Sequence, residues 1–335
     1  MERKPDIKII ESLRDRFGRV HNYLRLSITD RCNLKCIYCM PPDPVFMPAK
    51  KLLTVDEIDH LVSVFISMGI NKIRLTGGEA LSRKEFPKIV NRVVRHGIPL
   101  FLTTNGTLIH KHLDLIADTF TGVNISLDTL RSDRFSTITQ GNTFRQTVEN
   151  IKLALLKGIA VKINTVVIRN SNHDEIPEFV ELTRKYPVDI RFIEFMPFRN
   201  NHWNRYRNFS YEEILEIIQS KYDIERLEKN DTATADMYRV KNAPGRFGII
   251  ATVTHPFCPA CNRIRVTADG KIKNCLFGRK EYDLQPVMHD TDKLKALIVQ
   301  SVQEKHLQHG GNCLVNQLGE SNYCLLGRTM TAIGG

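Results

Sequence analysis

Hydrophobic and polar residues alternate in several short stretches of the chain. Residues 23–29 alternate with a period of two, which predicts a half-buried strand. Five further strands are predicted at residues 73–76, 100–103, 123–128, 161–168 and 189–196. A helical pattern follows each strand, so the chain is expected to contain six strand-helix units.

Helix boundaries are marked by capping signals. Thr54 and Glu57 form a capping box before apolar positions at helical spacing, and Gly69 can end that helix. A second capping box is predicted from Ser82 to Glu85, before a helix that ends near Gly97. A polar loop is expected between the strand at 123–128 and the next helix. The other helices are predicted near residues 113–117, 148–156, 176–183, 211–220 and 292–304.

Strand-helix units in series predict an α/β fold with a parallel sheet, which is either open or curled into a barrel. Polar residues share one face of two neighbouring strands: Asn124, Ser126 and Asp128 on one, Lys162 and Asn164 on the next. A complete eight-stranded barrel is packed with branched apolar side chains. The polar face therefore favours an incomplete barrel with a site inside it. A solvated sheet face is the alternative, and it is less favoured because parallel sheets are usually covered on both sides.

The chain after the sixth strand changes character. Residues 197–209 are rich in Arg, Asn and aromatic residues, including Trp203, and are expected to form a crossing loop between domains. A polar stretch runs to Lys241 after the helix at 211–220. The predicted division is an N-terminal segment at 1–20, a partial barrel at 21–200 and a C-terminal domain at 201–335.

Charge and composition limit the classes of partner and the cellular location that we expect. The 335 residues include 48 Lys and Arg against 37 Asp and Glu, a net charge of +11, which favours a polyanionic partner such as nucleic acid or a nucleotide polyphosphate. No stretch approaches the roughly 18 apolar residues of a membrane span. The first 20 residues mix acidic and basic side chains, unlike a secretory signal or an acid-poor transit peptide. We therefore expect the cytoplasm, or an organelle matrix if a targeting segment was removed.

Six of the eight cysteines fall into two groups, which predicts metal ligands in a reducing compartment. Cys32, Cys36 and Cys39 have the spacing C-x3-C-x2-C and are called the first cysteine site. Four thiolates normally hold a 4Fe-4S cluster, so three would leave one iron open to an external molecule. A partial zinc site or thiols that merely pack are the alternatives.

Cys258, Cys261 and Cys275 form the second cysteine site. A zinc ribbon is the alternative here, and Cys313, Cys324 or His255 could supply its fourth ligand. Given the first site, a second iron-sulfur cluster that lacks one ligand is favoured, and Cys313 and Cys324 are expected to be buried thiols. Arg263 and Arg265 lie on one face of an extended segment beside these cysteines.

Taken together, these motifs resemble the GTP 3',8-cyclases, a radical S-adenosylmethionine (SAM) family that begins molybdenum cofactor biosynthesis and includes molybdenum cofactor biosynthesis protein A. The resemblance covers nearly the whole chain. It rests on the two cysteine sites and on the segments 23–27, 74–79, 103–106, 125–128, 161–165, 191–194 and 262–265, with the Gly-Gly end. It implies an incomplete (β/α)6 barrel of the radical SAM type with a C-terminal extension that carries a second iron-sulfur site.

The resemblance also implies the role of each site residue. The first cysteine site would hold one 4Fe-4S cluster, and the second would hold another whose open iron binds the guanine of GTP. The residues that would contact SAM are Tyr38, Gly78, Ser126 and Met196. The residues that would gather around GTP are Arg25, Arg74, Thr103, Lys162, Arg263, Ile264 and Arg265. Arg263, Arg265, Gly334 and Gly335 are the catalytic candidates, although a terminal double glycine is usually a frayed end.

The implied enzyme is a lyase that converts GTP to (8S)-3',8-cyclo-7,8-dihydroguanosine 5'-triphosphate. Its implied partners are a flavodoxin or ferredoxin as electron donor, cyclic pyranopterin monophosphate synthase as the next enzyme and a second copy in a homodimer, with no membrane or nucleic acid. The family usually has Gly-Gly-Glu-Pro where this chain has Ala80, so we expect a less rigid loop at that point. The alternatives are a radical SAM enzyme that modifies RNA or a peptide, and a zinc-dependent nucleic-acid-binding protein.

Overall fold

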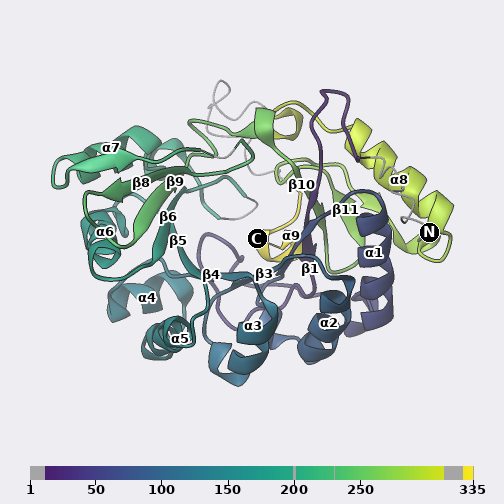
Figure 1. Ribbon diagram of the computed structural model, residues 1–335, viewed down its shortest axis with the longest axis horizontal. Coiled ribbons are helices and arrows are strands. Elements are labelled where there is room, and N and C mark those ends of the chain that lie inside the picture. Colours follow the sequence, from purple (N-terminus) through teal and green to yellow (C-terminus); the bar gives the residue numbers. More distant parts are fainter. Residues whose placement is uncertain (1–11, 199–200, 230, 313–326, 335) are drawn as a thin grey trace, which may run out of the picture.

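The computed structural model describes residues 12–198, 201–229, 231–312 and 327–334. These residues contain one twelve-stranded sheet with the strand order β12-β11-β10-β1-β2-β3-β4-β5-β6-β9-β8-β7. The sheet curves around a central space and does not close, because β12 and β7 end it on opposite sides (Figure 1). Within the described residues, no helix is long and apolar enough to cross a lipid bilayer.

The eight central strands, β10, β1 to β6 and β9, pair in parallel. The outer strands pair antiparallel and extend the sheet at both ends. The strands are β1 (Tyr23–Ser27), β2 (Lys72–Thr76), β3 (Leu100–Thr104), β4 (Gly122–Ser126), β5 (Val161–Val167), β6 (Asp189–Glu194), β7 (Ile224–Arg226), β8 (Asp236–Val240), β9 (Arg246–Ile250), β10 (Arg263–Val266), β11 (Lys271–Lys273) and β12 (Tyr282–Asp283).

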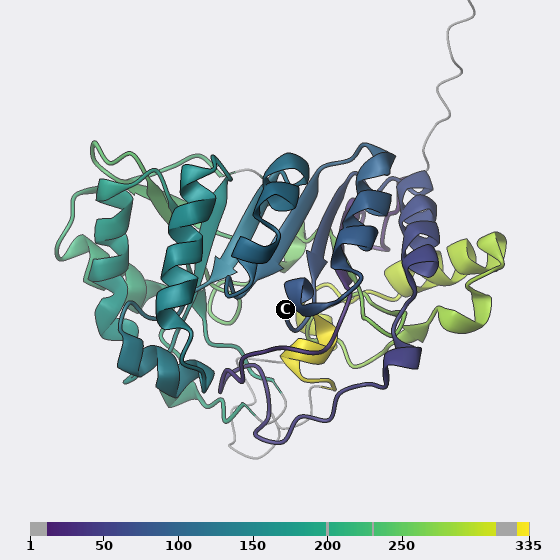
Figure 2. The same cartoon turned by 90° about the horizontal axis from the view of Figure 1, so that it is seen from below.

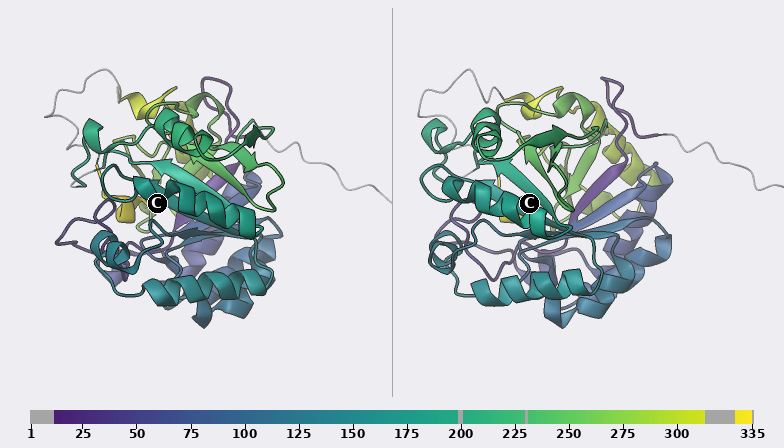
Figure 3. Two further views of the ribbon diagram at one scale, coloured as in Figure 1. Left: turned by 90° about the vertical axis from the view of Figure 1, so that its left-hand side faces the viewer. Right: turned by 60° about the vertical axis from the view of Figure 1, so that its left-hand side comes forward.

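The helices lie mostly on the convex side of the sheet (Figures 1 and 3). The exception is α9, which lies inside the curve near one end of the parallel strands (Figures 1 and 2). The helices are α1 (Val55–Ser67), α2 (Phe86–Val93), α3 (Leu113–Thr119), α4 (Ser132–Thr139), α5 (Phe144–Leu156), α6 (Ile176–Lys185), α7 (Tyr211–Gln219), α8 (Thr291–Gln303) and α9 (Met330–Ile333).

Six strand-helix units follow one another from β1 to α7, which confirms the predicted repeat. The capping box that begins α1 is also confirmed. Thr54 Oγ1 accepts a hydrogen bond from Glu57 N at 3.2 Å, and Glu57 Oε2 accepts one from Thr54 N at 2.7 Å.

The second predicted capping box, from Ser82 to Glu85, is wrong. Residues Ala80–Ser82 form a short 3₁₀ helix, and α2 begins only at Phe86. Arg83 explains the difference, because it donates hydrogen bonds to Ile28 O and Leu53 O, both at 2.6 Å, and pairs with Glu85 at 3.4 Å. Glu85 therefore does not cap the helix through its side chain.

Two other regions differ from the prediction. The expected polar loop before α5 contains α4, where Phe135 and Ile138 are the buried apolar residues, too few to produce a clear helical pattern. The polar stretch before residue 241 contains β7 and β8, which are antiparallel strands at the edge of the sheet. In β8 the buried residues are Tyr238 and Val240, and β7 has none, so too few apolar positions mark these strands in the sequence.

The two faces of the sheet differ as the alternation predicts. On β5, Val161 and Ile163 are buried on the convex side, whereas Lys162 and Asn164 are only partly buried on the other. Leu24 and Leu26 of β1 are completely buried in the same core. The polar inner face lies on the concave side of an incomplete barrel, so that prediction is confirmed.

Candidate active site

The concave side of the sheet contains a cavity of about 610 Å³. Inward-facing residues of β1, β2, β4, β5, β6, β9 and β10 form part of its wall, together with residues from the segments 232–237, 256–262 and 274–277. Asn124, Lys162 and Asn164, three of the five polar residues predicted to face inward, line it. Its volume falls in the range of small-molecule sites, about 300–1,000 Å³.

The cavity is strongly cationic. Of the described residues that line it, none is Asp or Glu and seven are basic: Arg25, Lys72, Arg74, Lys162, Arg191, Arg263 and Arg265. Asp189, which does not line the cavity, offsets part of this charge. Its Oδ2 atom lies 3.8 Å from Lys162 Nζ and 3.0 Å from Arg191 Nη2. A ligand that fits this surface carries several negative charges.

Strand register places three of the arginines in one row. Arg25 of β1 lies directly opposite Arg265 of β10 on one side and Arg74 of β2 on the other. Neighbouring strands are about 4.8 Å apart, so the three guanidinium groups start from adjacent positions on one face. Burial and the charge of Arg265 lower the pKa of Arg25 to about 9, and burial and the charge of Arg263 lower the pKa of Arg265 to about 10. A bound anion would relieve this repulsion.

The partners of these arginines differ. Arg74 donates to Tyr23 Oη and Leu102 O, both at 2.6 Å, and to Thr103 Oγ1 at 3.4 Å. Thr103 therefore supports Arg74, and it is not among the residues that line the cavity. In contrast, the Nε atoms of Arg263 and Arg265 are buried and have no hydrogen-bond partner within the described part of the chain. Buried donors normally have acceptors, and an anionic ligand would supply them.

The second cysteine site lies in the same cavity wall. Cys258, Cys261 and Cys275 all line the cavity. Cys261 Sγ accepts hydrogen bonds from Arg263 Nη2 at 3.5 Å and Lys305 Nζ at 3.4 Å. Burial acts to raise the pKa of Cys261, but Arg263 and Lys305 outweigh it and lower the pKa to about 5. Cys261 is therefore ready to bind a metal as a thiolate.

The first cysteine site forms the loop after β1, where Cys36 O accepts hydrogen bonds from Cys39 N at 2.9 Å and Met40 N at 3.0 Å. These residues do not line the cavity itself. Burial and the nearby carboxylate of Glu79 raise the pKa of Cys32 to about 11, and burial also raises the pKa of Cys36 and Cys39. A bound metal centre would compensate these buried thiolates.

The arrangement of the described thiols bears on the zinc alternative. Zn–S bonds are about 2.3 Å long, so the thiols of a zinc site must converge closely. Among the described residues, no group of three or more His, Cys, Asp or Glu side chains converges in this way.

Three of the four residues expected to contact SAM have contacts that tie them to the loop of the first cysteine site: Tyr38, Gly78 and Met196. Tyr38 Oη donates to Asp128 Oδ2 at 2.7 Å, and burial raises the pKa of Asp128 to about 6. Asn201 Nδ2 joins Tyr38 O and Met196 O, at 3.2 and 2.8 Å. Ser126 is the last residue of β4. A Cβ atom at Gly78 would lie 2.4 Å from Arg31 O, so only glycine allows this approach of two loops.

Helix α9 links the two cysteine sites. Met330 lines the cavity, and the backbone of Thr331 hydrogen-bonds Cys39. Gly334 has φ +86°, and a Cβ atom there would lie 2.6 Å from Ser27 Cβ, so this backbone fits against β1 only as glycine. Arg328 fixes the segment before α9 by ion pairs of 2.8 Å with Asp269 and 2.9 Å with Glu281.

One predicted residue does not reach the cavity with its side chain, and three others lie outside the described residues. The side chain of Ile264 is completely buried and lies on the face of β10 away from Arg263 and Arg265, so a role toward a ligand would rest on its main chain. Gly335, Cys313 and Cys324 lie outside the described residues.

Ala80 is buried at the start of a 3₁₀ helix. The side chain of Glu79 fixes this loop, because it accepts hydrogen bonds from Leu81 N at 2.9 Å, Thr104 Oγ1 at 2.8 Å and Asn105 N at 2.6 Å. The loop is therefore anchored without a proline.

The sequence analysis missed two basic residues of the cavity, Lys72 and Arg191. Both could have been predicted from the alternation of side chains along a strand, in which every second residue faces the same side. Lys72 lies two residues before Arg74 on β2, and Arg191 lies two residues before Ile193, which also lines the cavity, on β6. Residues at this spacing share a face of a strand.

Family models divide the chain into two parts. Residues 26–183 match the Radical SAM superfamily, and residues 188–311 match Molybdenum Cofactor Synthesis C. Among solved structures, Streptococcus suis SuiB bound to S-adenosylmethionine aligns with a TM-score of 0.60 and 15% identity, over 83% of this chain and 68% of that chain. At this identity the likeness shows the fold alone.

Relatives with named functions match most of the chain. It is 44% identical to molybdenum cofactor biosynthesis protein 1 of Drosophila melanogaster, over 89% of this chain and 54% of that protein. The chain spans about half the length of this and similar relatives. It is 39% identical to the mitochondrial GTP 3',8-cyclase of Arabidopsis thaliana, over 91% of this chain and 81% of that protein. It is 36% identical to the GTP 3',8-cyclase of Listeria monocytogenes, over 97% of this chain and 100% of that protein. With two family models in series and a relative matched along its full length, the chain belongs to the GTP 3',8-cyclase family of radical SAM proteins.

Proposed function

We propose that this protein converts GTP to (8S)-3',8-cyclo-7,8-dihydroguanosine 5'-triphosphate, the first step of molybdenum cofactor biosynthesis. The observation that carries the proposal is the row of Arg265, Arg25 and Arg74 in a cavity that the second cysteine site also lines. A triphosphate carries about four negative charges, and guanidinium groups pair with phosphate oxygens through two parallel hydrogen bonds. The family relationship supports GTP as the nucleotide.

The first cysteine site is proposed to hold a 4Fe-4S cluster through Cys32, Cys36 and Cys39, with SAM beside Tyr38, Gly78, Ser126 and Met196. When bound there, SAM would supply the radical chemistry that removes a hydrogen atom from carbon 3' of the ribose. The second site is proposed to hold another 4Fe-4S cluster through Cys258, Cys261 and Cys275, and its open iron would bind the guanine.

The protein's own contribution is to hold the substrate. The triphosphate is proposed to bind to Arg25, Arg74, Arg265 and Lys162. Arg263 lies against the ring of Phe257, with its guanidinium carbon 4.4 Å from the ring centre, and reaches the cavity beside Cys261. Positioning decides the rate, because a displacement of about 1 Å can cost roughly a hundredfold. Gly334 and the helix before it are proposed to complete the cavity wall near the ribose.

The remaining parts of the proposal follow from the family. They are a flavodoxin or ferredoxin as electron donor, cyclic pyranopterin monophosphate synthase as the next enzyme, a homodimer and a location in the cytoplasm or an organelle matrix. The division into segments 1–20, 21–200 and 201–335 also stays a prediction.

The test is an anaerobic reaction of the iron-loaded protein with SAM, dithionite and GTP deuterated at carbon 3'. We expect 5'-deoxyadenosine and a cyclised nucleotide in equal amounts, with deuterium in the 5'-deoxyadenosine. ATP in place of GTP should give no cyclised product. Formation of 5'-deoxyadenosine without deuterium, or product only with an added peptide or RNA, would contradict the proposal.

A further inference from the structure

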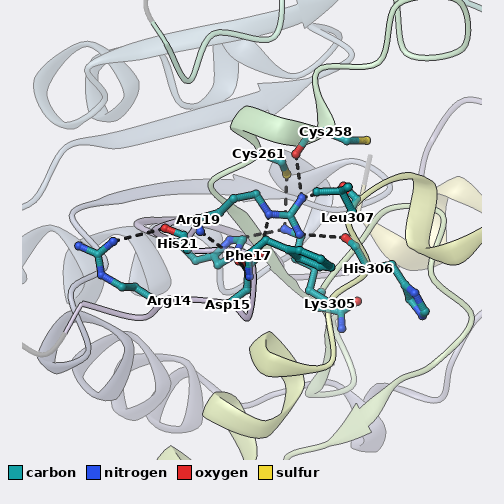
Figure 4. A network of polar contacts seen from close by, with 12 residues as sticks. Arg14, Asp15, Phe17, Arg19, His21, Cys258, Cys261, Lys305, His306 and Leu307 are labelled. Carbon is teal, nitrogen blue, oxygen red and sulfur yellow. Dashed lines mark hydrogen bonds and ion pairs between the residues drawn. The ribbon is translucent and has the colours of Figure 1, made fainter.

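A buried polar network lies next to the second cysteine site, and none of its four central residues, Asp15, Arg19, His21 and Lys305, lines the cavity (Figure 4). It joins three segments far apart in the sequence, at 15–21, 258–263 and 305–307. All four side chains are at most 9% exposed. The proposed chemistry gives these residues no role.

Asp15 and Arg19 form the frame of the network. Asp15 Oδ2 accepts from Arg19 Nε at 2.6 Å, and the guanidinium group also donates to Cys258 O, His306 O and Leu307 O, each at 2.8 Å. One buried arginine therefore holds the first cysteine of the second site and the chain after Lys305 in fixed positions.

Lys305 uses all three of its donors. Its Nζ atom lies 2.9 Å from Arg263 O, 3.4 Å from Cys261 Sγ and 3.4 Å from His21 Nδ1. The side chain is 2% exposed, so water does not compete for these positions. An ammonium group has three N–H donors, and each has one acceptor here.

His21 accepts one of the three hydrogen bonds of Lys305. Asp15 Oδ2 lies 3.1 Å from His21 Nε2, and a carboxylate only accepts hydrogen bonds, so Nε2 carries the proton. Burial and the charge of Lys305 lower the pKa of His21 to about 3, so the ring is neutral. Nδ1 then offers a lone pair, and Lys305 donates to it. The neutral ring accepts a hydrogen bond from Lys305 Nζ and so helps to fix the direction of the ammonium group.

The result is a buried ammonium group with an N–H donor aimed at Cys261 Sγ, a proposed cluster ligand. Burial lowers the pKa of Lys305, and the neighbouring thiolates of Cys261 and Cys275 act against this shift. Hydrogen bonds to ligating sulfurs and nearby charge set the reduction potentials of iron-sulfur centres. Reduction adds an electron, so a fixed positive charge at the sulfur stabilises the reduced form.

We propose that Lys305 is a positioning residue that makes the cluster of the second cysteine site easier to reduce, with Asp15, Arg19 and His21 holding it against Cys261. The inference rests on the proposed function, because it requires a cluster at that site. Lys305 would then set part of the reduction potential of this cluster from outside the substrate cavity.

The test uses the full chain with Cys32, Cys36 and Cys39 changed to Ser, so that only the second site binds iron. The parent, Lys305→Met and the control Lys293→Met are titrated with dithionite and redox mediators while the electron paramagnetic resonance signal is followed. Lys293 is exposed on α8 and ion-pairs only locally, with Asp290. We expect Lys305→Met to lower the equilibrium constant for reduction at least tenfold, which is about 59 mV for one electron. The control should change it less than twofold.

A second variant covers the case in which Lys305→Met binds no iron. Lys305→Gln keeps an N–H donor and removes the charge, and it should also lower the equilibrium constant. An unchanged potential in either iron-bound variant would overturn the inference while leaving the proposed cyclisation intact. A parent that binds no iron at the second site would instead contradict the proposed function.

Discussion

The two cysteine sites have the same number of thiols and opposite surroundings. The first lies near the carboxylates of Glu79 and Asp128, which with burial raise the pKa of its thiols. The second lies beside Arg263 and Lys305, which lower the pKa of Cys261. Cys261 and the thiols of the first site are therefore held in fields of opposite sign, whereas burial raises the pKa of Cys258 as it does in the first site.

This difference supports the proposed assignment of SAM to the first site and GTP to the second. A cluster with three thiolates is negatively charged, so in an acidic environment it favours a cationic partner. SAM carries a sulfonium cation and suits the first site. In the second site Arg263 and Lys305 already offset the charge of the Cys261 thiolate, and six other basic side chains line the cavity and remain to bind an anion. GTP suits that site.

The largest expected effect comes from removing one thiol from each site in turn. Cys36→Ser and Cys261→Ser should each reduce bound iron from about eight to about four per chain, on the basis of four irons per cluster. Both should abolish the cyclised product, but only Cys36→Ser should abolish SAM cleavage. Iron analysis and product chromatography measure this, and equal loss of SAM cleavage in both variants would remove the distinction between the sites.

Next in size is the loss of one arginine from the row. Arg265→Ala should weaken GTP binding by roughly ten- to a hundredfold, because a hydrogen bond to a charged group contributes about 1.5–3 kcal/mol. SAM cleavage should persist. Arg226→Ala is the matched control, since Arg226 lies in β7 with its side chain 64% exposed. Calorimetry with GTP measures the affinity, and unchanged binding by Arg265→Ala would argue against the arginine row.

Acid should lower the stability of the folded protein through His21, which lies beside the second site. In the unfolded chain His21 binds a proton below pH about 6.5, whereas in the folded protein its pKa is about 3. Between these values the unfolded state binds more protons, so folded stability falls as the pH drops, by up to about 1.4 kcal/mol per pH unit. Thermal unfolding at steps from pH 7 to pH 4 should show this slope. His21→Gln keeps a donor and an acceptor without titrating, so it should flatten the curve; an equal slope would exclude His21 as its source.

The smallest expected effect is at the loop beside the first site. Ala80→Pro restores the residue that the family usually has. Glu79 has φ −125° and ψ 108°, the extended conformation that precedes proline readily. We expect a gain in stability of about 0.4–1 kcal/mol, because proline restricts the unfolded chain. A calorimetric melting temperature at or below that of the unmodified protein would show that Ala80 is better suited to this loop.

How much the sequence predicts also differs between the two sites. Cys32, Cys36 and Cys39 are close in sequence and follow a strand with clear alternation, so both the loop and its place at the end of β1 were predicted correctly. The pairing of β10 with β1 joins residues about 240 positions apart, and no local pattern reveals that Arg265 lies opposite Arg25.

The network around Lys305 shows the same limit. Asp15, His21 and Lys305 are ordinary residues in their own segments, and only the packing of α8 and β10 beside the N-terminal segment brings them together. The capping box at Ser82 failed for a related reason, because Arg83 makes tertiary contacts that a local motif does not include.

The central claim is that SAM binds at the first site and GTP at the second, and single-site proteins test it most directly. Two full-length variants, each with the three cysteines of one site changed to Ser, would be reduced and examined by electron paramagnetic resonance with SAM or GTP added. We predict that SAM changes only the spectrum of the first cluster and that GTP changes only the spectrum of the second. A response of the first cluster to GTP, or no response of the second, would contradict the account.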